Sequence, residues 1–238
     1  MKVYGRVIVP VNDYFKTISE WNGIDHIELL ANYFELFDSD NNANFLIHFK
    51  KMLVRAVAGC MDFIPNYYAF VLVYNKQDND LADILKWLSP SQLSNYCKDK
   101  IELNDYGLEW LIDNFLINIQ DLSKLSKIEI NNLYDHIRTS QLDFIPSGKV
   151  RRSIFVKTCS FICSSSNVDF LRNFEETCNW ICFMIRNINK NYKKDIDINN
   201  IWSQVLHLYK SRFDYRVDLN EIVKANARLM LINPLSFN

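Results

Sequence analysis

The sequence has no excess of charge of either sign and no long apolar run. Its 238 residues include 27 basic and 28 acidic side chains. No overall field therefore attracts nucleic acid or a membrane surface, and any electrostatic site must be local. No apolar stretch reaches the roughly 18–20 residues that a membrane-spanning helix needs. We expect a cytoplasmic protein with no membrane contact, in which the six cysteines stay reduced.

The cysteines do not indicate a metal site. Two pairs have three intervening residues, Cys159 with Cys163 and Cys178 with Cys182, and four thiolates would suit zinc. Both pairs lie in apolar, strand-like stretches, however. On a strand, residues i and i+4 lie about 13 Å apart, which is too far for one metal ion. We interpret these cysteines as buried free thiols and predict no metal and no cofactor.

The pattern of apolar residues predicts an α/β fold in three parts. Helical periodicity dominates residues 1–64 after a short strand at Val7–Val9, and it includes a long apolar stripe over 42–62. From Pro65 to about residue 190, short apolar runs alternate with segments expected to be helical, which include 91–99 and 126–139. Near-continuous apolar strands separated by helices predict a mostly parallel sheet with both faces covered. We predict a helical cap (1–64), an α/β core (65–190) of four or five strands, including 68–74, 114–119 and 159–165, and C-terminal helices (191–238).

Residues 70–88, FVLVYNKQDNDLADILKWL, predict a buried strand, a loop and an apolar-striped helix. This is the layout of a phosphate-binding loop, in which backbone N–H groups and a helix N-terminus hold an anion. The loop has no glycine, so it does not readily adopt the positive φ angles that such a turn needs. It carries Asp78 and Asp80 instead, and two carboxylates facing a polyphosphate would oppose its binding by several kcal/mol.

Six segments, in order, carry a resemblance to a known family: VNDYFKTISEWNGIDHIELLANYF, FKKMLVRAVAGCM, FVLVYNKQDNDLADILKWLSP, FLINIQDLSKLSKIEI, SGKVRRSIFVKTCSFICSSSNVDFL and SRFDYRVDLNEIVKANARL. They resemble the ATPase half of the bacterial virulence-associated protein E group, which is related to superfamily-3 helicases and to phage and plasmid primase-helicases. The similarity covers nearly the whole chain. It implies a P-loop NTPase-like fold of the AAA+ or superfamily-3 kind.

The resemblance also implies that the nucleotide-binding motifs are degenerate. The family's phosphate loop, G-x-Q-G-x-G-K-S/T, falls on residues 75–82, where the phosphate-pairing lysine becomes Leu81 and the magnesium-binding hydroxyl becomes Ala82. The family's consecutive Asp and Glu, which hold magnesium, fall on Gln120 and Asp121. The altered positions are Asn75, Lys76, Gln77, Asp78, Asp80, Leu81, Ala82, Gln120 and Asp121.

Two further parts of the family's ATPase site differ in this chain. The polar sensor, usually Asn, falls on Ser166, with Asn167 beside it, and the arginine finger pair falls on Cys178 and Asn179. Loss of the finger alone would reduce turnover by ~10³–10⁵-fold. Four parts altered together predict a pseudo-ATPase that is not an enzyme. Residual ATPase activity is the outlying alternative.

A local basic cluster is the remaining candidate site. Between Asp143 and Asp169 there is no acidic residue, and Pro146 and Gly148 predict a turn. In superfamily-3 helicases a comparable basic loop contacts the nucleic-acid backbone, so the resemblance implies such a role here. The alternative interpretation is an ordinary solvated turn. The candidate nucleic-acid contacts are Lys149, Arg151, Arg152 and Lys157.

Two functions follow from this pattern. The first is a non-catalytic relative of mobile-element or phage replication helicases that binds nucleic acid weakly and without sequence preference, or that works with a replication protein. The second is a structural or regulatory subunit that docks on an active, related ATPase through their shared subunit interface. The first function requires residues 146–157 to be exposed.

Overall fold

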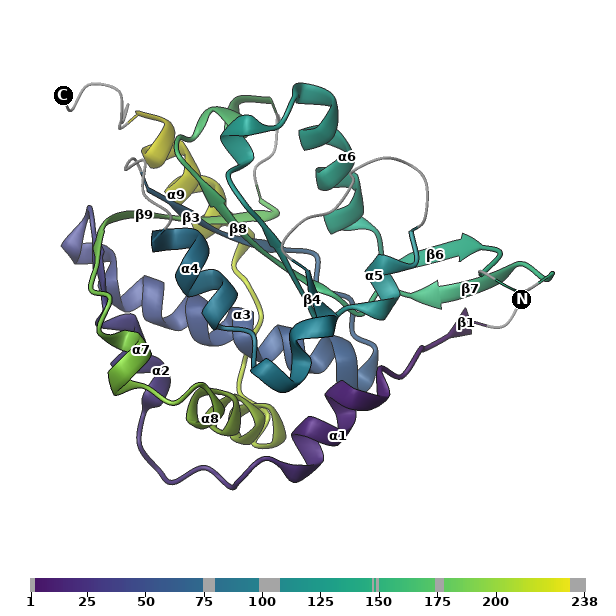
Figure 1. Ribbon diagram of the computed structural model, residues 1–238. Coiled ribbons are helices and arrows are strands. Elements are labelled where there is room, and N and C mark those ends of the chain that lie inside the picture. The colour runs from purple at the N-terminus through teal and green to yellow at the C-terminus, as the bar shows by residue number, and fades with distance from the viewer. Residues whose placement is uncertain are drawn as a thin grey trace.

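The computed structural model describes residues 3–74, 80–98, 108–146, 148, 150–173 and 178–231. Helices and strands alternate along the chain (Figure 1). The strands are β1 (Val3–Tyr4), β2 (Phe34–Leu36), β3 (Ala69–Val73), β4 (Cys97–Lys98), β5 (Leu116–Ile119), β6 (Gln141–Phe144), β7 (Ser153–Val156), β8 (Ser160–Ser165) and β9 (Trp180–Ile188). The α-helices are α1 (Val9–Thr17), α2 (His26–Ala31), α3 (Asn42–Asp62), α4 (Asp80–Trp87), α5 (Trp110–Asp113), α6 (Lys127–Arg138), α7 (Tyr192–Asp195), α8 (Ile198–Lys210) and α9 (Leu219–Leu231). Four 3-10 helices complete the described elements: η1 (Ser39–Asn41), η2 (Ser91–Tyr96), η3 (Leu122–Lys124) and η4 (Asp169–Asn173).

The main sheet has six strands in the order β2-β9-β3-β8-β5-β4. All neighbouring pairs are parallel except β2 with β9, which is antiparallel. The strands expected at 68–74, 114–119 and 159–165 are β3, β5 and β8, so the prediction of a mostly parallel sheet is confirmed. The sheet has more than the expected four or five strands, because β2 joins its edge from the segment expected to form a helical cap.

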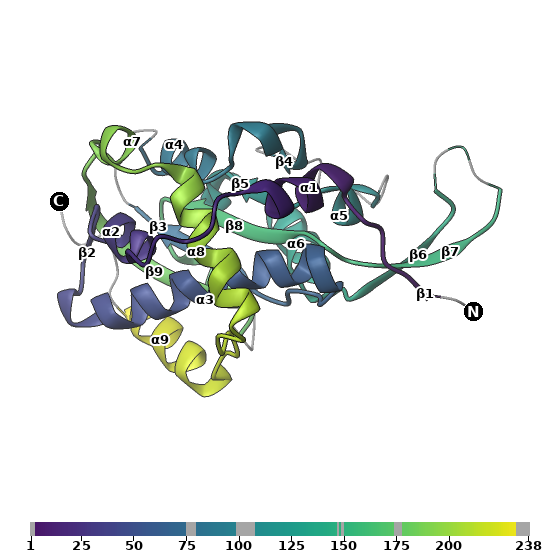
Figure 2. The same ribbon diagram turned by 90° about the horizontal axis from the view of Figure 1, so that it is seen from below.

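Helices cover both faces of this sheet, which forms two cores (Figures 1 and 2). Successive side chains of a strand point to opposite faces. On β3, Phe70 and Leu72 therefore pack with α1, α2, α3, α4 and α8, whereas Val71 and Val73 pack with α5 and α6. Strands buried on both sides have no polar face, which is why they read as continuous apolar runs.

The long helix α3 passes very close to the chain that leads into β8. A Cβ atom on Gly59 would lie 2.7 Å from the backbone oxygen of Thr158. Only glycine permits this approach without movement of one of the two segments, and the closeness fixes how α3 lies against the sheet.

Two local predictions are wrong. No strand forms at Val7–Val9: Val9 begins α1, and Pro10 lies in its first turn, where the fixed φ of proline suits the start of a helix. The stretch 91–99, expected to be helical, contains the 3-10 helix η2 and then β4. That short edge strand pairs with β5, so tertiary pairing overrides the local helical pattern there.

A second, smaller sheet projects from the body. β7 pairs antiparallel with β6 and parallel with β1, in the order β1-β7-β6. The β6–β7 hairpin, residues 141–156, extends away from the main sheet in both views (Figures 1 and 2). We call this hairpin the arm.

Candidate functional site

The positions that the resemblance assigns to the phosphate loop, the magnesium-binding pair and the sensor follow the carboxyl ends of β3, β5 and β8. Because these strands run parallel, their carboxyl ends lie together. The N–H of Tyr74, after β3, donates to the backbone oxygen of Ser165 at the end of β8 over 2.9 Å. The loop positions Asn75, Lys76, Gln77 and Asp78 lie outside the described residues, so their assignment stays a prediction.

The helix that follows this loop presents no phosphate-binding side chain at the two key positions. α4 begins at Asp80, whose side chain is outside the described part. Leu81, at the position of the family's lysine, is 4% exposed and belongs to the core that contains α3 and α8. Ala82 is half-buried and has no polar group. The first turn of α4 therefore packs against the core with Leu81, the position that the resemblance assigns to the family's lysine.

Asp121 is held by its own neighbours. Its carboxylate accepts hydrogen bonds from the hydroxyl of Ser123 (2.6 Å) and the N–H of Ser166 (3.1 Å), and it forms an ion pair with Lys124 (3.2 Å). Its own N–H donates to Ser164 Oγ over 2.9 Å. These contacts join the end of β5 to the end of β8.

The backbone and the charge of Asp121 both depend on this network. Its φ of 56° is left-handed, a conformation that Asp tolerates better than most residues. Burial acts to raise the pKa of the carboxyl group, but the hydrogen bonds from Ser123, Lys124 and Ser166 together lower the pKa below its usual value. The carboxylate is thus ionised and already paired with Lys124 and the two serines. The neighbouring Gln120 is exposed to solvent and carries no charge.

The two positions that the resemblance assigns to the arginine finger lie at the start of β9, at the end of the sheet opposite the carboxyl ends of the parallel strands. Asn179 directly precedes β9, and its backbone oxygen accepts the N–H of Ala69 over 2.9 Å. Its side chain donates to the backbone oxygen of Tyr67 (2.8 Å) and accepts from the hydroxyl of Tyr134 on α6 (3.2 Å). Cys178 is half-buried beside it. These contacts fasten α6 to the sheet, which is a structural role.

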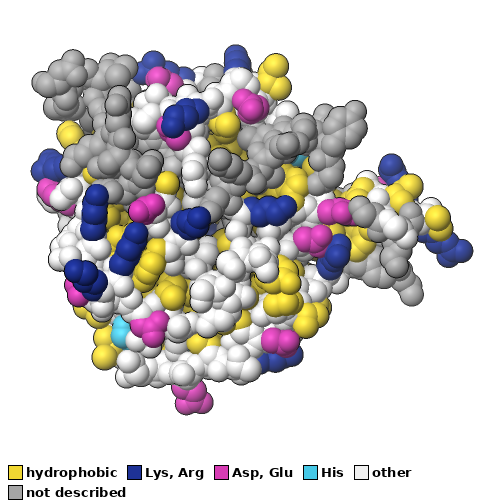
Figure 3. Space-filling model, viewed as in Figure 1, with side chains coloured by type: hydrophobic (Ala, Val, Ile, Leu, Met, Phe, Trp, Pro, Cys, Tyr) yellow, Lys and Arg dark blue, Asp and Glu magenta, His cyan; other side chains and the backbone are white. Residues whose placement is uncertain are grey.

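The arm carries the basic turn that the sequence predicts. Arg151 and Arg152 are exposed, and Arg152 forms an ion pair with Asp143 of β6 over 3.6 Å. Lys149 lies outside the described residues. In the space-filling view, Lys and Arg side chains lie at the outer end of the arm (Figure 3). The part of residues 146–157 that forms the outer end of the arm therefore stands clear of the body.

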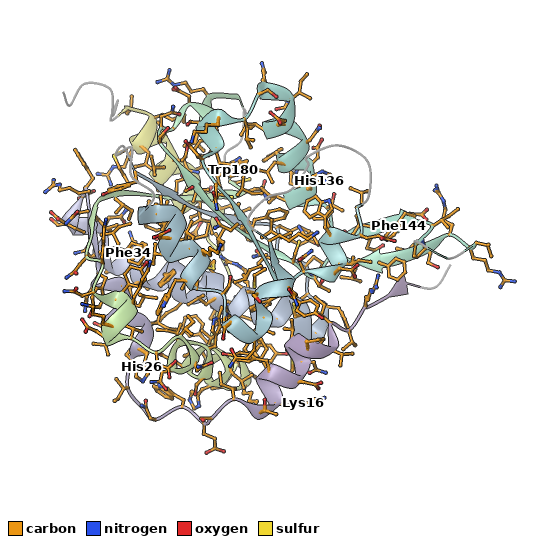
Figure 4. All side chains as sticks on the ribbon, in the orientation of Figure 1. Lys16, His26, Phe34, His136, Phe144 and Trp180 are labelled. Carbon is orange, nitrogen blue, oxygen red and sulfur yellow. The ribbon has the colours of Figure 1, made fainter. Side chains whose placement is uncertain are left out.

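Lys157 does not belong to this basic surface, and its prediction as a nucleic-acid contact is wrong. Its side chain is fully buried, at 0% exposed. Nζ donates to the backbone oxygens of His136 (3.1 Å) and Ile137 at the end of α6, and it lies over the rings of Tyr67 and Phe161. Burial lowers its pKa to about 8. Lys157 anchors the base of the arm, and Figure 4 shows His136 beside that base and Phe144 on the arm.

Sequence reasoning missed the hydroxyl network and the buried lysine. The resemblance marks Ser166 only as the counterpart of the family's sensor, whereas Ser164 and Ser123 belong to no motif. Their position in the chain could have indicated the network, because polar residues directly after parallel strands lie together at the carboxyl ends of those strands. No comparable signal separates a buried Lys157 from the exposed Arg151 and Arg152.

No metal site or membrane span is seen in the parts of the chain that are described. In those ranges no three His, Cys, Asp or Glu side chains are grouped so that they could hold a metal ion. Nor does any helix there have the length and apolar character to cross a bilayer. Of the four cysteines at issue for zinc, Cys159, Cys163 and Cys182 are buried and unbridged, and Cys178 is half-buried.

Solved structures with a similar fold include the C-terminal region of NrS-1. One apo structure of this region superposes with a TM-score of 0.61 at 16% sequence identity, covering 90% of this chain and 53% of that chain. An A-form apo structure gives a TM-score of 0.56 at 14% identity, covering 93% of this chain and 54% of the other. The chain thus spans about half the length of these structures, and the likeness establishes the fold. A search of curated protein sequences gives no match.

The family follows from the sequence profile of the virulence-associated protein E-like domain, which matches residues 15–230. This match includes the strands of the main sheet, the network around Asp121 and the arm. It agrees with the six collinear segments of the sequence. The chain belongs to the virulence-associated protein E-like domain family.

Proposed function

We propose that this protein is a non-catalytic member of its family that binds nucleic acid through the arm. The observation that carries the proposal is the exposure of Arg151 and Arg152 at the end of a hairpin that projects from the body. Guanidinium groups on a projecting turn can reach phosphates without a groove in the body. The family's relation to phage and plasmid primase-helicases supports a role in the replication of a mobile element.

The nucleotide site supports the non-catalytic part of the proposal. Leu81 fills the core instead of facing phosphate. Asp121 is paired with Lys124 and the serines, and the adjacent Gln120 cannot add the negative charge that magnesium needs. Each feature acts against ATP binding or turnover: Leu81 lies on α4, and Gln120 and Asp121 directly follow β5.

Nucleic-acid binding of this kind should be weak, independent of sequence and sensitive to salt. With Lys157 buried, about two or three phosphate contacts remain, which gives a slope of roughly −1.5 to −3 in log K against log salt. Asp143 competes for Arg152 with any phosphate. This competition further reduces the contribution of Arg152 to phosphate binding.

The test is a fluorescence-anisotropy titration with single- and double-stranded DNA at two salt concentrations. Arg151→Ala/Arg152→Ala should weaken binding and reduce the salt slope by about 1 to 2. A matched control is Lys193→Ala/Lys194→Ala, which removes the same charge from α7, on the far side of the molecule from the arm (Figure 1). The control should retain the slope of the unmodified protein.

Two results would contradict the proposal. Equal slopes for the two double variants would remove the arginines from the site. Absence of binding at low salt would favour the alternative function, a regulatory subunit that docks on a related ATPase.

A further inference from the structure

The outer end of the arm is apolar as well as basic. Val150 is 92% exposed, the highest exposure among the large apolar side chains of the described residues, and Ile145 is 52% exposed. Arg151 and Arg152 follow Val150 directly. An exposed apolar side chain next to two cations is complementary to a ligand in which an apolar surface lies next to anionic groups.

The strands that carry this end are held to each other and to the body. β7 lies between β6 and β1, so the hairpin is stiffened by a third strand. The rings of Phe144 and Phe155 pack across the two strands with centroids 5.3 Å apart. Lys157 fastens the end of β7 to α6. These contacts fix the strands from which the outer end of the arm projects.

From this arrangement we propose that Val150 inserts into a base step while the arginines hold the flanking phosphates. The inference rests on the proposed function. Valine is branched at Cβ and has little rotamer freedom, and apolar wedges of this kind unstack base pairs at a cost that depends on the step. That cost is lowest at a mismatch or a junction. The substrate class is therefore duplex nucleic acid with a weakened step, in preference to a uniform duplex.

The experiment compares three DNA probes of equal length: a uniform duplex, the same duplex with one mismatch, and a single strand. Val150→Ala should weaken binding to the mismatched duplex by roughly 3- to 10-fold, because two methyl groups lose their contact with bases. Its affinity for the other two probes should stay within a factor of about two of the unmodified protein. Val150→Ile, which keeps the apolar branch, should retain the preference. Ile128→Ala is the matched control, since Ile128 is 72% exposed on α6.

A second measurement reports insertion directly. 2-Aminopurine beside the mismatch should become more fluorescent on binding of the unmodified protein, and Val150→Ala should abolish this rise. An equal effect of Val150→Ala on all three probes would overturn insertion, as would an unchanged fluorescence rise. In either case arginine-dependent binding would leave the proposed function intact. If no probe binds even at low salt, both proposals fail. Binding to anionic phosphatidylserine vesicles in place of DNA would also overturn the inference.

Discussion

Replacing Lys157 by methionine tests how the arm is fixed to the body. The carbonyl groups of His136 and Ile137 are among the last of α6, where backbone oxygens lack partners inside the helix. The lysine ammonium supplies those partners. Methionine keeps the apolar stem but leaves two buried carbonyls unpaired, at about 1–3 kcal/mol each, and relief of the buried charge offsets part of this cost. We expect Lys157→Met to lower the free energy of unfolding by about 1–3 kcal/mol at pH 7, measured by urea titration.

The pH dependence of the same pair of proteins gives a sharper criterion. Burial lowers the pKa of Lys157 to about 8 in the folded state, against roughly 10.4 in an unfolded chain. Between these values the unfolded state binds a proton that the folded state has released, so stability rises with pH. From pH 7 to pH 9 the unmodified protein should gain about 1 kcal/mol relative to Lys157→Met.

Lys16→Met is the control for this experiment, because the side chain of Lys16 is 62% exposed (Figure 4). Its effect on stability should stay within about 0.5 kcal/mol. Parallel pH profiles for the unmodified protein and Lys157→Met would refute the reasoning, because they would mean that the ammonium is not buried.

Three further outcomes are expected. ATP with magnesium should leave the melting temperature unchanged, and a shift that corresponds to a micromolar dissociation constant would contradict the loss of nucleotide binding. Asp121→Asn should lower the free energy of unfolding by about 1–2 kcal/mol at pH 7. Because the folded-state pKa of Asp121 is lowered, this contribution is present above the unfolded pKa and is lost as the pH falls through the folded pKa; urea midpoints at neutral and acidic pH measure both effects. Gly59→Ala should lower the free energy of unfolding by about 1–3 kcal/mol, because the added Cβ would meet the backbone oxygen of Thr158. An unchanged melting temperature would contradict this prediction and show that α3 can move away.

The elements best predicted from the sequence are the strands that are buried on both faces. β3, β5 and β8 appear as apolar runs between helices because each of their faces meets a layer of helices. The helices α3 and α6 follow from the spacing of their apolar residues. The turn at Pro146 and Gly148 follows from residues whose backbone preferences differ from those of a strand.

The remaining features depend on contacts between distant segments. β2 and β4 have three and two residues, too few to show a period, and exist because a neighbouring strand offers hydrogen bonds. Lys157 is buried because the end of α6 packs against it. The sequence of residues 149–157 alone does not predict that contact. The hydrogen bond from the N–H of Ser166 to the Asp121 carboxylate likewise forms only because β5 and β8 lie side by side.

One strand joins the two regions on which the proposals depend. β8 begins three residues after Lys157, at the base of the arm, and ends at the serines that contact Asp121. Its six residues span roughly 20 Å, so the network around Asp121 and the arm are connected by a strand but share no side chain. Changes around Asp121 therefore do not remove the exposed charges of the arm. The loss of nucleotide chemistry that we propose at one end of β8 is therefore compatible with the nucleic-acid surface that we propose at the other.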